Sequence, residues 1–142
     1  MGRNVSFVVT AFAAWLVVAG CAFGSQASCA RDVSSNRVEP ERVAPGETFR
    51  FHGEGFAGDC YDTGQLGQPP PERDLRIDLR QGEKSWRLAT VDAGPAPDYA
   101  LDAELTVPEG AEPGRAVVEI HTKLSRTPDR VPLHVLVPAS VP

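Results

Sequence analysis

Apolar and polar residues alternate one by one along several segments of this sequence, and this pattern restricts the possible folds more than any other feature. In LRIDLR, residues 75–80, the aliphatic side chains fall on one side of an extended chain, and two arginines and Asp78 fall on the other. A period of two predicts strands with one buried face and one solvated face. On this basis the residues expected in the core are Phe49, Phe51, Leu75, Ile77, Leu79, Leu101, Ala103, Leu105, Val107, Ala116, Val118, Ile120, Val131, Leu133, Val135 and Val137. A less regular strand over residues 85–91 places Trp86, Leu88 and Thr90 together on one side.

Segments rich in proline and glycine separate these strands, at residues 44–47, 81–84, 93–98, 108–114 and 126–130. Proline fixes φ and glycine permits positive φ, which are the dihedral angles that tight turns require. No segment after the first twenty residues keeps a helical apolar period of useful length. About seven short antiparallel strands with frequent turns predict an all-β, immunoglobulin-like sandwich that follows a cleaved signal peptide. A small barrel is the alternative, because strand spacing alone does not separate the two architectures.

Two further segments resemble immunoglobulin-like modules of the bacterial IPT/TIG kind. The first is VEPERVAPGETFRFHGEGF, residues 38–56, and the second is VPEGAEPGRAVVEI, residues 107–120. The sequence departs from the pattern between Gly58 and Asp74, where the connecting segment is longer than expected. The resemblance implies a binding, spacing or accessory module, and it brings no catalytic residues with it.

The first twenty residues have the three parts of a secretory signal: a short start with Arg3, an uncharged apolar run, and small residues at the end. Val18, Ala19, Gly20 and Cys21 resemble the lipobox at which bacterial lipoproteins are lipidated and cleaved. The resemblance implies a diacylglyceryl thioether on Cys21, with acyl chains such as palmitate as the membrane anchor. An ordinary signal peptide and an uncleaved anchor helix are the alternatives. The expected organisation is a signal peptide (1–20), a short linker (21–28), the β-sandwich (29–138) and a tail (139–142).

Lipidation of Cys21 leaves Cys29 and Cys60 as an even pair. In an exported domain such a pair predicts a disulfide. The bridge would close a loop of about 30 residues and stabilise the domain by roughly 2–4 kcal/mol. A reactive thiol or a metal ligand is the alternative role for these two cysteines.

The expected mature chain is acidic. Without residues 1–20 it has 13 basic and 19 acidic side chains, a net charge of −6. No run of basic residues interrupts this composition. Nucleic acid and anionic lipid surfaces are therefore not expected as partners.

The sequence contains no motif for catalysis or cofactor binding. A G-x-S-x-G motif is absent, and the acidic residues are scattered through predicted loops and outer faces, as solvation would scatter them. His52, His121 and His134 are all expected on the solvated faces of their strands, where neighbouring strands could bring them together around a metal ion. We therefore assign no catalytic, cofactor or metal-binding residue.

The segment AGDCYDTGQLGQPPPERD, residues 57–74, is long for a loop in a compact domain, and such loops are often functional. Cys60 could hold its base, and the three prolines should stiffen one arm as polyproline II. It is either a solvated insertion or a recognition loop at one end of the sandwich. The candidate recognition residues are Asp59, Tyr61, Asp62, Pro69, Pro70 and Pro71.

Together these features predict a lipid-anchored, non-catalytic, immunoglobulin-like module at the extracytoplasmic face of the bacterial cell membrane. Its role would be binding or scaffolding, with the membrane engaged through the lipid on Cys21 and an unidentified protein or cell-envelope component as partner. The alternative is an exported carrier of a metal or small ligand that uses the surface histidines or the 57–74 loop. A small hydrolase with an unrecognised site is a third hypothesis.

Overall fold

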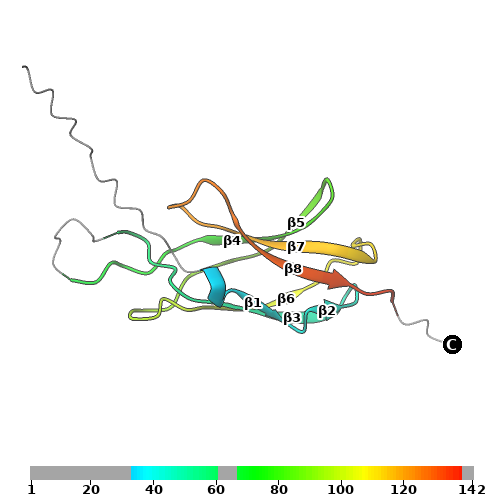
Figure 1. Cartoon of the computed structure of the whole chain (residues 1–142), viewed down its shortest axis with the longest axis horizontal. Coiled ribbons are helices and arrows are strands. Elements are labelled where there is room, and N and C mark those ends of the chain that lie inside the picture. Colours follow the sequence, from blue (N-terminus) through cyan, green and yellow to red (C-terminus); the bar gives the residue numbers. More distant parts are fainter. Residues whose placement is uncertain (1–32, 61–66, 139–142) are drawn as a thin grey trace, which may run out of the picture.

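The computed structural model describes residues 33–60 and 67–138, in which two β-sheets pack face to face as a β-sandwich (Figure 1). A short 3-10 helix, η1 (Val33–Ser35), precedes the strands. None of the described segments forms a helix long and apolar enough to cross a membrane. The strands are β1 (Arg37–Glu39), β2 (Arg42–Val43), β3 (Thr48–Gly53), β4 (Leu75–Gln81), β5 (Lys84–Val91), β6 (Leu101–Thr106), β7 (Gly114–His121) and β8 (Asp129–Val135).

One sheet has three strands in the order β1-β3-β6, and the other has five in the order β2-β8-β7-β4-β5. The all-β prediction is confirmed, but the described chain has eight strands, and they are not all antiparallel. The early strands explain the difference: β1 pairs antiparallel with β3, whereas β2, which begins three residues after β1 ends, pairs parallel with β8. The N-terminal part of the sandwich therefore contributes to both sheets.

The alternating residues meet between the two sheets and form one apolar core. Phe49 and Phe51 on β3 pack there, and Phe51 makes an edge-to-face contact with Phe56 at 6.4 Å between ring centroids. The predicted core residues are buried, with one exception outside the irregular β5 strand. Val137 is 73% exposed, because it lies two residues beyond the end of β8 at Val135.

The prediction for β5 was wrong in part, because this strand contains a bulge. Its register against β4 shifts between Ile77 and Asp78, so that one residue of β5, Leu88, has no direct partner. Thr90 is consequently exposed. The β5 side chains that pack against the edge of the core are those of Trp86, Leu88, Ala89 and Val91.

Several connections meet at one end of the sandwich, which we call the loop end: η1 and residues 54–60, 67–74, 92–100 and 122–128 (Figure 1). The Glu54 N–H donates to Ser35 Oγ at 3.2 Å, and the Gly55 N–H donates to the Asp98 carbonyl at 2.8 Å. The first described residue, Val33, therefore lies at the loop end of the domain.

A buried carboxylate ties the connections of the loop end together. Glu72 is only 2% exposed, and its Oε1 accepts a hydrogen bond from the backbone N–H of Lys123. The Glu72 N–H donates to the Phe56 carbonyl at 2.9 Å, and the Ala93 N–H donates to the Glu72 carbonyl at 2.9 Å. Glu72 thus links four segments that are far apart in the sequence, and the prediction that acidic residues lie only in solvated positions was wrong here.

Candidate functional site

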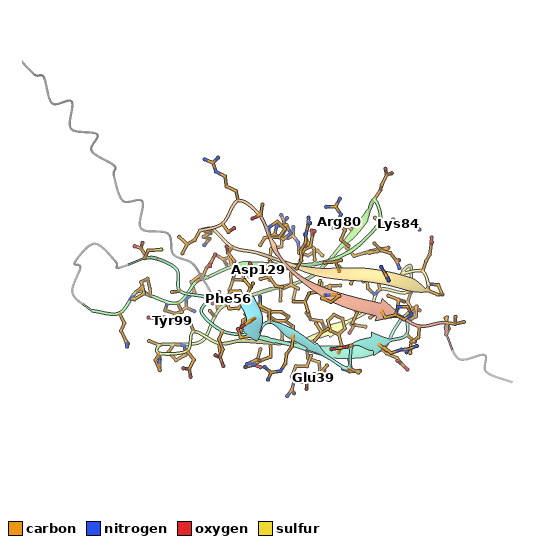
Figure 2. The ribbon with its side chains drawn as sticks, viewed as in Figure 1. Glu39, Phe56, Arg80, Lys84, Tyr99 and Asp129 are labelled. Atoms are coloured by element: carbon orange, nitrogen blue, oxygen red, sulfur yellow. The ribbon has the colours of Figure 1, made fainter. Side chains whose placement is uncertain are left out.

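The outer surface of the five-stranded sheet carries an unusual concentration of arginines, which we call the arginine face. Figure 2 shows Arg80 on the outward side of this sheet and Glu39 on the outward side of the other sheet. The face has a formal charge of +4 when its two carboxylates, Asp78 and Glu119, are counted, whereas the whole chain has a charge of −5. The arginine face consists of Arg42, Arg76, Arg80, Arg87, Arg115 and Arg130.

The alternation of each strand places these arginines outward. On β7, for example, Ala116 and Val118 point into the core, so Arg115 and Val117 point away from it. The same holds for Arg130 on β8, which precedes the buried Val131. Strands that are separated in the sequence but adjacent in the sheet therefore bring their arginines onto one surface.

At the centre of the arginine face, four charged residues form a row across four adjacent strands. Asp78 on β4 is the direct cross-strand partner of Arg87 on β5 and of Glu119 on β7, and Glu119 is the partner of Arg130 on β8. The order across the sheet is thus positive, negative, negative, positive. Although all four side chains point outward, those of Asp78 and Glu119 are only 10% and 6% exposed.

Three basic groups surround Asp78. Arg87 Nε donates to Asp78 Oδ1 at 3.1 Å, and His121 Nε2 lies 3.3 Å from Oδ2. Arg76 Nε lies 3.0 Å from the same Oδ2, but its N–H is not aligned for a hydrogen bond, so that contact is ionic. The sequence prediction that Asp78 is a solvated outer residue was therefore wrong, because neighbouring basic side chains cover it.

Glu119 has a similar set of neighbours. Arg130 Nε donates to Glu119 Oε1 at 3.0 Å, and Arg80 Nη1 lies 3.7 Å from the same oxygen. His121 Nε2 lies 3.9 Å from Oε2, so this ring stands between the two carboxylates. Glu119 and Asp78 thus share one histidine and each hold at least two arginines.

His121 also contacts Arg76, whose Nη2 lies 3.2 Å from both ring nitrogens. The ring thus lies between Arg76 and the two carboxylates, with donor and acceptor roles that depend on its tautomer.

The arginines around the two carboxylates keep part of each guanidinium in solvent. The side chains of Arg76, Arg80, Arg87 and Arg130 are between 42% and 61% exposed. Arg87 and Arg130 are held to the carboxylates through Nε, and the terminal amino groups of a guanidinium are the donors that form paired hydrogen bonds with an anion. This arrangement can bind phosphate or carboxylate groups from solvent.

Two shallow hollows adjoin each other on the arginine face. One, of about 310 Å³, lies between Arg80, Arg115 and Arg130. The second, of about 370 Å³, lies beside Arg42 and Pro132, and the carboxylate of Glu41 also borders it. Arg115 borders both hollows, together with Ala116 and Val117, so the surface is continuous from one to the other.

The candidate recognition loop lies at the loop end and away from the arginine face. Its two described arms approach each other: Ala57 forms an isolated antiparallel bridge with Pro71, and the Gly58 N–H donates to the Pro70 carbonyl at 2.7 Å. The base of the 57–74 segment is therefore held as a narrow pair of extended arms.

Other contacts fix the prolines and the residues near Cys60. The buried Tyr99 donates its hydroxyl hydrogen to the Pro69 carbonyl at 2.9 Å, and Asp59 Oδ1 accepts from the Cys60 N–H at 2.7 Å. Tyr61 and Asp62 lie outside the described residues. A recognition role for this loop stays a prediction.

The lipobox residues Val18 to Cys21, and Cys29, also lie outside the described part of the chain. Cys60 is described and half-buried at the loop end. Lipidation of Cys21 and a disulfide between Cys29 and Cys60 accordingly stay predictions.

The three histidines occupy separate places. His52 is on β3 in the three-stranded sheet, with Nδ1 2.8 Å from Asp102 Oδ1 and Nε2 3.6 Å from Glu54 Oε1. His121 and His134 are on neighbouring strands, but they lie near opposite ends of their shared ladder. In residues 33–60 and 67–138, no group of three or more His, Cys, Asp or Glu side chains is arranged to hold a metal ion.

Two exposed carboxylates have altered acidity. The backbone N–H of Asp74 and the guanidinium of Arg73 hold the pKa of Asp92 below its ordinary value. The ammonium of Lys84 lowers the pKa of Glu112. Both groups brace connections between strands, and neither belongs to the arginine face.

A comparison of the chain with protein-family models, with curated proteins and with solved structures found no match.

Proposed function

We propose that this protein is a lipid-tethered, non-catalytic binding module that holds an anionic component of the bacterial cell envelope against its arginine face. The lipid would be carried by Cys21, and the domain would stand at the extracytoplasmic face of the cell membrane. The β-sandwich supports the further proposal that the domain is of the immunoglobulin-like, IPT/TIG kind that its sequence resembles.

The observation that carries the proposal is the pair of buried carboxylates beneath partly exposed arginines. Asp78 and Glu119 each bind a guanidinium through Nε and leave its outer part in solvent. A free arginine loses much rotamer freedom when it binds, whereas an arginine that is already oriented loses less. Carboxylates in these positions therefore prepare the face for an anionic ligand.

The gathering of arginines on one face stands out because the protein as a whole is acidic. An acidic chain repels anions on average, and no run of basic residues appears in its sequence. The six arginines nevertheless gather on one sheet surface. These six arginines thus concentrate positive charge on one defined part of an acidic molecule.

Binding of inorganic triphosphate to the full-length lipidated protein in detergent micelles tests the proposal. The double substitution Arg115→Ala and Arg130→Ala removes two arginines that border one hollow. We expect the dissociation constant to rise by at least about tenfold, because a hydrogen bond to a charged group contributes about 1.5–3 kcal/mol.

The matched control is Arg37→Ala with Arg50→Ala, which removes the same charge from the outer face of the three-stranded sheet. It should change the affinity by less than about twofold, because charges more than about 10 Å away are screened at physiological salt. An equal loss in both variants, or no binding by the unchanged protein, would contradict the proposal.

A further inference from the structure

The arginines are too widely spaced for one small anion to contact them all. Arg87 on β5 and Arg130 on β8 are three strands apart in the sheet, a separation of about 14 Å at the ordinary strand spacing. Arg76 and Arg80 are four residues apart on β4, which is about 13 Å along a strand. Several anionic groups at once are needed to engage this face.

The two adjoining hollows give such a ligand a continuous path. The first is bordered by Arg80 and Arg130, the second by Arg42, and Arg115 stands at their junction. Val117 lines both hollows, and its cross-strand partner on β8, Pro132, lines the second. A chain laid across the strands would meet an arginine on both sides of this apolar floor.

Position 132 suits proline, because no described strand lies where an amide hydrogen at this position would point. The N–H groups of His134 and Leu136 point toward the β2 segment, where they donate to Glu41 and Val43. By alternation, the nitrogen of Pro132 points the same way but lies before the first residue of β2, so an amide hydrogen there would have no β2 residue to bind.

The same surface is poorly suited to two other polyanionic partners. Binding of single-stranded nucleic acid normally uses aromatic side chains on which bases stack, and the outward residues of the described strands of this sheet include no Phe, Tyr or Trp. A membrane surface normally receives inserted apolar side chains. The large hydrophobic residues that are exposed within the described chain lie off this face: Val33, Leu124 and Val137.

Building on the anion-binding role proposed above, we infer that the ligand is a linear polyanion that carries a phosphate or carboxylate on each repeat. The chain of the polymer lies along the two hollows, and its successive anionic groups bind successive arginines. The structure thus assigns the arginine face to a polymer and not to a single small anion.

The dependence of affinity on ligand length tests this inference. Orthophosphate, triphosphate and long-chain polyphosphate are titrated into the full-length lipidated protein at equal phosphate concentration. We expect the dissociation constant per phosphate to fall by about 100-fold or more from triphosphate to the long chain, because linked groups bind at a high effective concentration. Polyglutamate of matched length distinguishes a carboxylate polymer from a phosphate polymer.

The variant Arg42→Ala removes the arginine that borders the second hollow but not the first. It should weaken binding of the long chain by about tenfold or more and binding of triphosphate by a smaller factor, because only the long chain reaches from one hollow to the other. The variant Arg37→Ala with Arg50→Ala should change neither ligand.

The outcomes separate this inference from the proposed function. Triphosphate binding without any gain for the long chain would overturn the polymer inference and leave anion binding intact. If the unchanged protein bound none of the three phosphate ligands, both the polymer inference and the proposed anion-binding function would be overturned. Tighter binding of oligothymidylate with the same number of phosphates would assign the face to nucleic acid, and displacement of polyphosphate by micelles with an anionic phospholipid would assign it to lipid headgroups.

Discussion

Asp78 on β4 and Glu119 on β7 are direct cross-strand partners, so two buried carboxylates face each other across the sheet. Like charges in directly opposed positions destabilise a sheet. Arg87 and Arg130 extend the row on either side and bind the carboxylates at 3.1 and 3.0 Å. The arginines therefore compensate the negative charges of the two carboxylates, and the carboxylates in turn orient the arginine side chains.

Replacement of Glu119 by Gln tests whether this row stabilises the fold. Arg130 would keep a polar neighbour but lose its charged one, and we expect the free energy of unfolding to fall by about 1–2 kcal/mol. The loss should be smaller than the roughly 3–5 kcal/mol of a fully buried pair, because the Arg130 side chain is more than half exposed. Chemical denaturation measures it. The control Glu104→Gln, on the exposed face of β6, should change stability by less than about 0.5 kcal/mol. Equal losses in the two variants would show that Glu119 contributes no more to stability than an exposed glutamate does.

Replacement of Tyr99 by Phe should loosen the base of the 57–74 loop. The substitution removes the hydroxyl that donates to the Pro69 carbonyl at 2.9 Å, and we expect a loss of about 0.5–1.5 kcal/mol. Hydrogen exchange should then quicken at the Gly58 amide, which donates to Pro70 next to the lost contact. The His134 amide, which donates to Glu41 on the far side of the domain, serves as the control and should keep its rate. Unchanged exchange at Gly58 would mean that Tyr99 does not fasten this arm.

The contribution of Asp92 should depend on pH. Its pKa is held below the ordinary value by the backbone N–H of Asp74 and by Arg73. A carboxylate with a lowered folded-state pKa stabilises the fold above its unfolded-state pKa and loses this effect as pH falls through the folded-state pKa. Asp92→Asn should therefore lower the melting temperature at neutral pH and have a diminishing effect in acid, as thermal melts across a pH series would show. Asp98→Asn, at an exposed position in the same connection, is the control. A deficit in Asp92→Asn that persists at the acid end would contradict this origin.

Replacement of Cys21 by Ser tests the proposed anchor. The substitution removes the thiol that would carry the acyl chains, so the protein should leave the membrane fraction or keep its first twenty residues. Cell fractionation and intact-mass measurement report these outcomes. The matched variant Cys60→Ser should stay in the membrane fraction and melt at a lower temperature, because loss of a disulfide destabilises a small domain by about 2–5 kcal/mol. If the two variants exchanged these properties, our division of the cysteines would be wrong.

Features that depend on the residues of a single strand could be predicted from the sequence, whereas features that depend on the pairing of distant strands could not. Alternation is local, so it correctly placed the inner residues of β4, β6 and β7. The bulge in β5 was missed because it depends on the register with β4, which no single strand encodes. Val137 was misassigned for the same reason, since the pairing with β7 and β2 decides where β8 ends.

The arginine face was missed because its members are far apart in the chain. Single arginines such as Arg42, Arg87 and Arg130 stand in separate segments and read individually as solvated outer residues. Their association follows from the strand order of the five-stranded sheet. The signal that could have indicated it is the recurrence of arginine at outward positions of several predicted strands, with an acidic residue beside it in β4.

The arginine side-chain Nε–H resonances of the full-length protein offer the most direct measurement, because each one reports whether that guanidinium meets an anion. In a titration with triphosphate, we expect shifts at Arg80, Arg115 and Arg130, which border one hollow. Arg37 and Arg50, on the opposite sheet, should keep their positions. Shifts that appear equally on both sheets, or at none of these five arginines, would show that the arginine face is not an anion-binding surface.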